Sequence, residues 1–291
     1  MRNSRSRLAA LTATASAAVL AGVLIATGAG STAQAAPERS APKTTTVVKS
    51  KTVDKLAAKP TIVLVHGAFA DSSGWNDVIA RLTKQGFPVL AFSNPLRGPV
   101  SDGEYLRQFL STIPGNIVLV GHSYGGAVIT NAAAGNPNVK ALVYVAAYAP
   151  EEGESVAAAN ELGGGHTDVT KHLVIRPFPG AAEGDADAFI DPKWFHQLFA
   201  QDLKRSVTAP MAVSQRPGAL AALGLPSGPA AWKTIKSWFL VAKQDRIIPP
   251  QAERAMAKRA GAKTVVINSS HVAMMSHPKV VTNLIRQAAT R

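Results

Sequence analysis

Short apolar runs alternate with longer amphipathic stretches along most of the chain. The apolar runs are rich in Val, Ile and Leu, which is typical of strands buried on both faces of a sheet. They span about 61–65, 87–92, 117–120, 139–147, 237–241 and 263–267. Helices are predicted between and after them, at about 75–84, 101–113, 127–134, 251–260 and 278–289. Strands that alternate with helices join through right-handed crossovers, so the pattern predicts an α/β fold with a mostly parallel, doubly wound sheet of about six strands.

One long interval, about 150–232, breaks this alternation. It contains three consecutive glycines, several prolines and the aromatic residues Phe178, Phe189, Trp194, Phe195 and Phe199. A loop of this length without secondary structure is rare inside a compact domain. We therefore expect a small, mostly helical cap, inserted between the fourth and fifth strands of the sheet.

Residues 1–35 have the composition of a secretory signal peptide. Three arginines precede a long uncharged stretch rich in Ala, Leu and Val, and Ala33-Gln34-Ala35 forms a cleavage motif. The stretch approaches the length of a membrane span, so an uncleaved anchor is the alternative, but the cleavage motif and the many Ala, Thr and Ser residues favour removal. We predict export by the general secretory route, a mature protein that begins at Ala36, and no stable membrane insertion after cleavage.

The chain has a formal net charge of +13 and no cysteine. Without cysteine the chain forms no disulfide, and it has neither a thiolate nucleophile nor a cysteine ligand for a metal. Residues 36–59 are rich in Thr, Lys and Pro, and we predict a disordered basic linker there, followed by one folded domain over 60–291. The basic residues do not alternate with aromatic ones, so a nucleic-acid partner is not predicted, and loose adhesion to an anionic surface is the expectation. Nothing in the sequence indicates an oligomeric state.

The motif G-x-S-x-G occurs at Gly121–Gly125, between a predicted strand and a predicted helix. This context is that of a nucleophile elbow, in which a serine is pushed out at a sharp strand-to-helix turn. Glycines on either side of Ser123 remove side chains that would collide with it. The N-terminus of the following helix directs N–H groups toward negative charge that develops nearby. Ser123 is therefore the candidate nucleophile.

A serine hydroxyl needs a base, and the base needs an acid that orients it. In elbow-containing folds these residues follow in the order Ser, Asp or Glu, His. Asp245 comes just after the fifth predicted strand and His271 just after the sixth. The carboxyl ends of parallel strands meet at one edge of the sheet, where ligands bind in α/β folds. The order and placement predict a catalytic triad of Ser123, His271 and Asp245.

Several alternatives to this assignment stay open. Glu151 and Glu152 follow the fourth predicted strand and are rival acids, and His277 is a rival base, although it precedes Pro278 and is typical of a helix start. The sequence has no H-E-x-x-H or other metal-binding spacing, so no metal and no cofactor are predicted.

An oxyanion requires two preorganised N–H donors. We expect them from the backbone of Tyr124, directly after the nucleophile, and of Ala68, in the loop after the first strand. His66 is expected to brace that loop. Phe69 and Trp194 are the candidate substrate contacts.

Four segments carry a resemblance to a known family: His66–Phe69 with Trp75, Gly121–Gly126, Asp245–Pro249 and His271–Pro278. They resemble the α/β-hydrolase superfamily, within the group of plant methylesterases, hydroxynitrile lyases and related bacterial esterases, over about residues 60–290. The lyases have a Lys after the triad His and a Thr in the first loop, where this chain has Val272 and Gly67. The resemblance therefore implies hydrolysis of a small-molecule ester through an acyl-enzyme.

Other functions remain possible on the same scaffold. A cofactor-free haloperoxidase or perhydrolase resembles this fold and uses the same triad. A hydroxynitrile-lyase-like enzyme is disfavoured by Val272, and a ligand-binding protein is disfavoured because such proteins usually have a degraded triad. The sequence does not indicate which acyl chain and which alcohol make up the ester.

Overall fold

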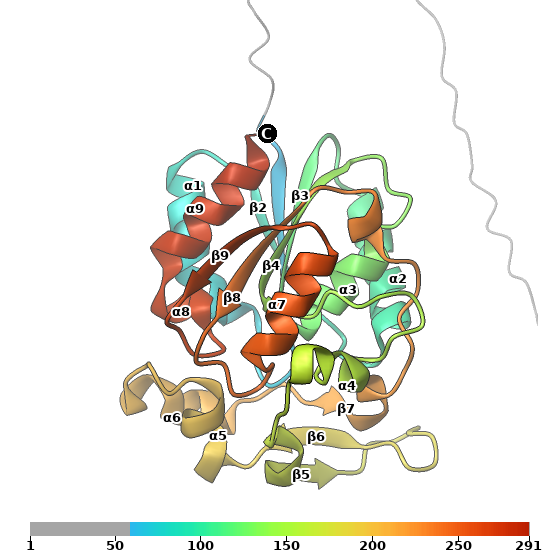
Figure 1. Ribbon diagram of the computed structural model, residues 1–291, viewed down its shortest axis with the longest axis vertical. Helices are drawn as coiled ribbons and strands as arrows, with labels where there is room; N and C mark the ends of the chain where they lie inside the picture. Colours follow the sequence, from blue (N-terminus) through green and yellow to red (C-terminus); the bar gives the residue numbers. More distant parts are fainter. Residues whose placement is uncertain (1–58, 291) are drawn as a thin grey trace, which may run out of the picture. The chain divides into compact units, whose positions relative to one another are not determined.

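A six-stranded, all-parallel sheet forms the centre of the structure (Figure 1). The structure is a computed structural model, and it describes residues 59–290. The strands lie in the order β2–β1–β3–β4–β8–β9. Their bounds are Thr61–Val65 (β1), Val89–Phe92 (β2), Ile117–Ser123 (β3), Val139–Ala147 (β4), Ser237–Ala242 (β8) and Lys263–Ile267 (β9). The six strands are those predicted, with small shifts at their ends. The predicted leader, and all but the last residue of the predicted linker, lie outside the described residues.

The apolar character of each strand follows its place in the sheet. The central strands β3 and β8 are buried along their whole length, whereas the edge strands β2 and β9 each have exposed positions. Central strands of a parallel sheet are covered on both faces, which explains their continuous Val, Ile and Leu runs. Because all six strands run the same way, their carboxyl ends lie along one edge of the sheet.

Helices cover both faces of this sheet (Figure 1). Helices α1 and α9 pack on one face, and α2, α3 and α7 on the other. Helix α2 begins two residues before the predicted start, because a proline is favoured at the first helical position. No helix within residues 59–290 is both long and apolar enough to cross a membrane. The helix bounds are Asn76–Lys84 (α1), Pro99–Ser111 (α2), Tyr124–Ala132 (α3), Pro250–Arg259 (α7), Ala273–Ser276 (α8) and Pro278–Ala289 (α9).

The interval between β4 and β8 forms the expected cap, but its secondary structure is mixed. It contains the helices Val156–Ala159 (α4), Pro192–Phe199 (α5) and Arg205–Val213 (α6). It also contains an antiparallel sheet that the sequence analysis did not predict, made of Leu173–Arg176 (β5), Asp187–Ile190 (β6) and Gly218–Ala219 (β7). β-branched and aromatic side chains meet across β5 and β6, with Val174 opposite Phe189, and such pairs favour a strand over a helix.

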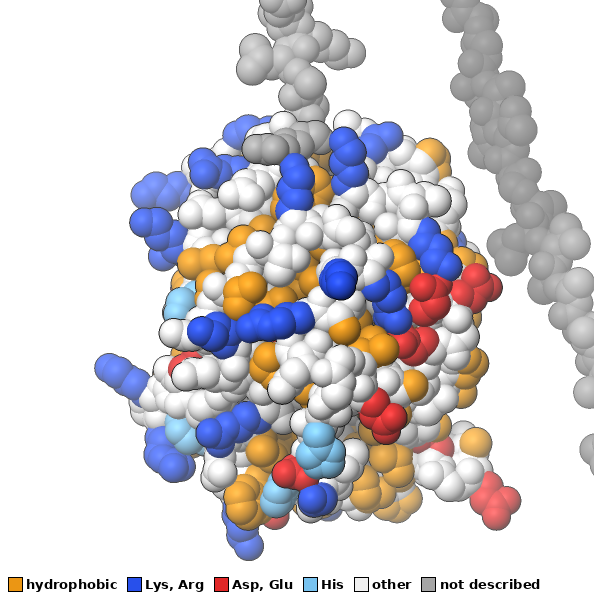
Figure 2. Space-filling view, in the orientation of Figure 1, with side chains coloured by type: hydrophobic (Ala, Val, Ile, Leu, Met, Phe, Trp, Pro, Cys, Tyr) orange, Lys and Arg blue, Asp and Glu red, His pale blue; other side chains and the backbone are white. Residues whose placement is uncertain are grey.

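Charged side chains are dispersed over the face shown in Figure 2, where Lys and Arg lie among uncharged residues and beside some acidic ones. Two ion pairs in the described part of the chain join Glu154 to Arg259 and Glu151 to Lys233. Pairs of this kind at a surface contribute little stability. On this face the basic side chains are therefore spread out and form no single patch.

Candidate active site

Ser123 lies at the turn between β3 and α3 in a strained backbone conformation, with φ 55° and ψ −129°. Such strain in a residue other than glycine is stored at functional sites. Its neighbours make room for the turn: a Cβ atom at Gly121 would lie 2.7 Å from the Gly125 carbonyl oxygen, and one at Gly126 would lie 2.3 Å from the Tyr148 carbonyl oxygen. The Tyr148 N–H also donates to the Ser123 carbonyl at 3.1 Å. The local geometry is that of the elbow expected from the motif.

The loop after β1 passes directly against this serine. A Cβ atom at Gly67 would lie 2.5 Å from the Ser123 Cβ and 3.0 Å from its Oγ, so only glycine fits there. His66 holds the loop in place: its Nε2 accepts from the Asn94 N–H at 3.0 Å, and its Nδ1 lies 2.9 Å from the Gly67 carbonyl oxygen. Burial lowers the pKa of His66, which keeps the ring neutral and able to accept at Nε2. The expected bracing role of His66 agrees with these bonds.

Asp245 and His271 form a buried pair at the same edge of the sheet. The His271 Nδ1 lies 2.6 Å from the Asp245 Oδ2, and neither side chain is exposed. The other carboxylate oxygen, Oδ1, accepts from the N–H groups of Ile247 at 2.7 Å and Ile248 at 3.0 Å. The carboxylate thus directs the imidazole proton to Nδ1, which leaves Nε2 with a free lone pair.

The His271 Nε2 is buried and has no hydrogen-bond partner within residues 59–290, and Ser123 is not bonded to it there. Catalytic hydrogen bonds are often long before substrate binds. The residue beside Ser123 links the two: the His122 Nε2 donates to the His271 carbonyl oxygen at 2.9 Å, and their rings lie 4.6 Å apart. Burial lowers the pKa of His122 well below its ordinary value, so this ring is a neutral donor.

The rival acids and the rival base have other partners. Glu151 binds Lys233, and Glu152 is exposed. The His277 Nδ1 lies 2.9 Å from the Ser276 hydroxyl, and the residue stands at the start of α9. Among the acids considered, Asp245 alone is hydrogen-bonded to His271 in the described part of the chain.

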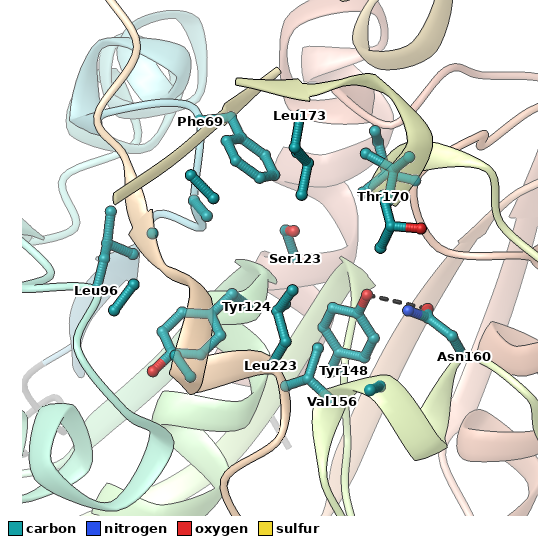
Figure 3. Close-up of a pocket in the computed structure, with 18 residues that line it drawn as sticks. Phe69, Leu96, Ser123, Tyr124, Tyr148, Val156, Asn160, Thr170, Leu173 and Leu223 are labelled. Carbon is teal, nitrogen blue, oxygen red and sulfur yellow. Dashed lines mark hydrogen bonds between the residues drawn. The ribbon is translucent and has the colours of Figure 1, made fainter. Parts of the chain in front are cut away.

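An apolar cavity opens above Ser123, between the sheet edge and the cap (Figure 3). The volume that the centre of a water-sized sphere can occupy inside this cavity is about 80 Å³. Since one water needs roughly 10–15 Å³ on this measure, the space suits a small organic molecule. The polar residues that line it are Ser123, Tyr124, Tyr148, Asn160 and Thr170, and the Tyr148 hydroxyl donates to the Asn160 Oδ1 at 3.0 Å. Ala68, Phe69, Leu96, Leu173 and Leu223 are among the apolar residues that line it.

Comparison with known proteins agrees with this arrangement. Residues 62–284 match the alpha/beta hydrolase family. The chain belongs to this family. The match includes the elbow, the Asp245–His271 pair and the cap between them.

Similar proteins match either most of the chain or a shorter part of it. An alpha/beta hydrolase of Aspergillus novofumigatus is 26% identical over 255 residues, which are 79% of this chain and 97% of that protein. A carbendazim hydrolyzing esterase of Nocardioides sp. is 38% identical over 109 residues, which are 33% of this chain and 45% of that protein. The crystal structure of polyneuridine aldehyde esterase superposes with a TM-score of 0.68 at 19% identity, covering 79% of this chain and 98% of that one, and thus shares its fold.

Of the other residues predicted for the site, three line the cavity and one lies at the surface. Ala68 and Tyr124 line the cavity beside Ser123, as does Phe69. The Ala68 N–H has no acceptor within residues 59–290, and Tyr124 is the first residue of α3, where an N–H has no intrahelical acceptor. Trp194 does not line the cavity, contrary to our expectation: it is 38% exposed and packs on His172, with ring centroids 4.1 Å apart. The amphipathic helix α5 turns this residue outward.

Two residues near the pair were missed by the sequence analysis. His122 was counted only as part of the motif, and Glu253 was not considered. Glu253 lies on α7 and is fully buried, with Met256 and Ala257 on the same buried face. A carboxylate on the apolar face of a helix is a signal that helical periodicity can reveal.

No group of three or more His, Cys, Asp or Glu side chains within residues 59–290 is placed to hold a metal ion.

Proposed function

We propose that the chain is a secreted serine carboxylesterase that hydrolyses small, mostly apolar esters through Ser123, His271 and Asp245. The observation that carries the proposal is the buried Asp245–His271 bond at the sheet edge where the strained Ser123 opens into the cavity. It supplies a base with a free Nε2 lone pair next to a nucleophile elbow. Relatives named as esterases support the same reaction class.

The chemistry follows from these positions. The Ser123 Oγ attacks the ester carbonyl carbon while the His271 Nε2 takes the hydroxyl proton, and the carbonyl electron pair moves to the oxygen. The N–H groups of Ala68 and Tyr124 stabilise that oxyanion. Collapse of the intermediate expels the alcohol, which receives the proton from Nε2 and leaves an acyl-enzyme. Water then gives a proton to Nε2 and attacks the acyl carbon, and the proton returns to Ser123 as the acid departs.

The lining of the cavity narrows the substrate class. No charged side chain is among the residues that line it. A charged substrate would lose its hydration there without gaining an ionic partner, which is costly. An uncharged ester of modest size with an apolar acyl group fits this lining. Gly67 and Val272, which stand where hydroxynitrile lyases have Thr and Lys, favour hydrolysis over lyase chemistry.

The direct test removes the nucleophile. Ser123→Ala should lower kcat on p-nitrophenyl esters by about 10⁴-fold or more and abolish labelling by a fluorophosphonate. Ser237→Ala is a matched control, since this serine, the first residue of β8, is also 5% exposed but donates to the Ile235 carbonyl oxygen. It should keep both activity and labelling. Intact labelling of the Ser123 variant would overturn the assignment.

A substrate panel separates the proposal from its alternative. Esters of rising acyl length and methyl esters of aromatic acids should be hydrolysed, with rates falling once the acyl chain exceeds the cavity. Steady formation of peracid from acetate and hydrogen peroxide at a rate above ester hydrolysis would favour a perhydrolase.

Secretion is tested separately, because the residues that support it lie outside the described range. The supporting features are the three arginines, the apolar stretch and the Ala33-Gln34-Ala35 motif. N-terminal sequencing of the protein from culture supernatant should begin at Ala36. A cell-bound protein that retains Met1 would contradict the proposal.

A further inference from the structure

The mechanism leaves one buried acid beside the catalytic pair without a role. Glu253 is 0% exposed on α7, which packs against β8. Its Oε2 accepts from the Ala242 N–H at 3.0 Å, whereas its Oε1 has no donor within residues 59–290. The Asp245 N–H donates to the Ala242 carbonyl oxygen at 3.2 Å, so Glu253 and Asp245 both bond to Ala242 at the turn that follows β8. An ionised carboxylate with so few donors in a buried place is costly, so the charge state of Glu253 needs an explanation.

Two adjacent buried carboxyls cannot both be ionised at neutral pH. Asp245 accepts three hydrogen bonds, from His271 and from the N–H groups of Ile247 and Ile248, whereas Glu253 accepts one. The negative charge is therefore better stabilised on Asp245. Burial and the neighbouring charge of Asp245 raise the pKa of Glu253 well above its usual range.

We propose that Glu253 is a positioning residue of the active site, which keeps a proton and donates it in a hydrogen bond to Asp245. The inference rests on the proposed function for its catalytic consequence, but not for its charge state. A neutral carboxyl donor holds the Asp245 carboxylate against His271 without adding a second negative charge. The pair Asp245–Glu253 then carries a single charge, which matches the single positive charge that His271 gains when it accepts the serine proton.

Few other groups act on Glu253. Arg254, its neighbour on α7, favours the ionised form of Glu253 and is the weakest of the influences on it. The Tyr148 hydroxyl, after β4, donates to Asn160, and burial, with the nearby carboxyl groups of Asp245 and Glu253, raises its pKa, so it stays uncharged. Asp245 is thus the charged group that dominates the environment of Glu253.

The catalytic test compares two substitutions. Glu253→Gln retains an oxygen for the Ala242 N–H and an N–H for Asp245, so kcat should stay within about threefold of the wild type. Glu253→Met keeps the volume but removes the donor, and kcat should fall about 10- to 100-fold, the usual effect of losing a hydrogen bond to a charged group. KM should stay unchanged, because Glu253 does not line the cavity. Equal kcat in the two variants would overturn the positioning role.

A second measurement does not depend on catalysis and applies even if the Met variant fails to fold. Unfolded Glu loses its proton above about pH 4.5, whereas folded Glu253 keeps it, so unfolding releases a proton and rising pH favours unfolding. Between about pH 5.5 and 7.5, the unfolding constant of the wild type should rise about tenfold per pH unit relative to that of Glu253→Gln. Glu183 is exposed, so Glu183→Gln is the control, and its unfolding constant should change with pH as that of the wild type does.

The two measurements separate the possible failures. Parallel unfolding curves for the wild type and Glu253→Gln would show an ionised Glu253 and overturn the inference. If the curves diverge as expected while Ser123→Ala remains active, the proposed function fails and the protonated state of Glu253 stands.

Discussion

Asp245→Asn tests the link between tertiary geometry and chemistry, because the structure dictates how the new amide must be oriented. Two backbone N–H groups, of Ile247 and Ile248, point at Oδ1. The amide oxygen of Asn must take that place, so its NH₂ group faces the His271 Nδ1. An N–H donor there requires Nδ1 to be the acceptor, which moves the imidazole proton to Nε2. His271 is then unable to take the proton of Ser123.

The size of the effect follows from the same contacts. To accept a proton at Nε2, the imidazole would have to carry its own proton at Nδ1, facing the N–H of the new amide. Two buried donors would then have no acceptor, and each costs about 1–3 kcal/mol of free energy. Loss of the charged hydrogen bond at 2.6 Å adds about 1.5–3 kcal/mol. A total of about 5 kcal/mol corresponds to a fall in kcat of roughly 10⁴-fold. KM should change little, since Asp245 does not line the cavity.

The assay is steady-state hydrolysis of a p-nitrophenyl ester by the purified variant, with circular dichroism and thermal melting to confirm that it folds. Glu151→Gln and Glu152→Gln are the matched controls, and each should stay within about twofold of the wild type, because Glu151 binds Lys233 and Glu152 is exposed. An Asn variant that keeps more than a tenth of the activity, or a crippled Glu variant, would refute the placement of the acid.

Two further substitutions test the surroundings of the nucleophile. Gly67→Ala places a methyl group 2.5 Å from the Ser123 Cβ, and we expect kcat to fall at least 100-fold and urea unfolding to show a loss of about 1–3 kcal/mol; unchanged kinetics would mean that the loop does not approach the serine. Trp194→Ala should leave kcat/KM for small esters within about twofold, since the ring packs on His172 away from the cavity; a large rise in KM would place it at the substrate.

Much of the fold was predictable because it depends on local patterns. Each buried strand is a continuous apolar run, and each connecting helix repeats its apolar face every three to four residues, so both periods appear in the sequence. The elbow is local as well, since the glycines that make room for Ser123 lie within three residues of it. The α/β-hydrolase fold and the position of the candidate nucleophile therefore follow from the chain alone.

Contacts between distant segments were decided only by the tertiary structure. Asp245 and Glu151 are both acids after buried strands, and only the order of β4, β8 and β9 in the sheet brings the former to His271. The approach of Gly67 to Ser123 arises because β1 and β3 are neighbours.

In the cap, a strand pair depends on partners far along the chain, so β5–β7 left a weaker sequence signal than the parallel strands. The charge state of Glu253 depends on Asp245 and on the burial of this face of α7 against β8. The place of Glu253 on the apolar face of a helix is visible in the sequence, but the approach of Asp245 is not, because it depends on the assembled core.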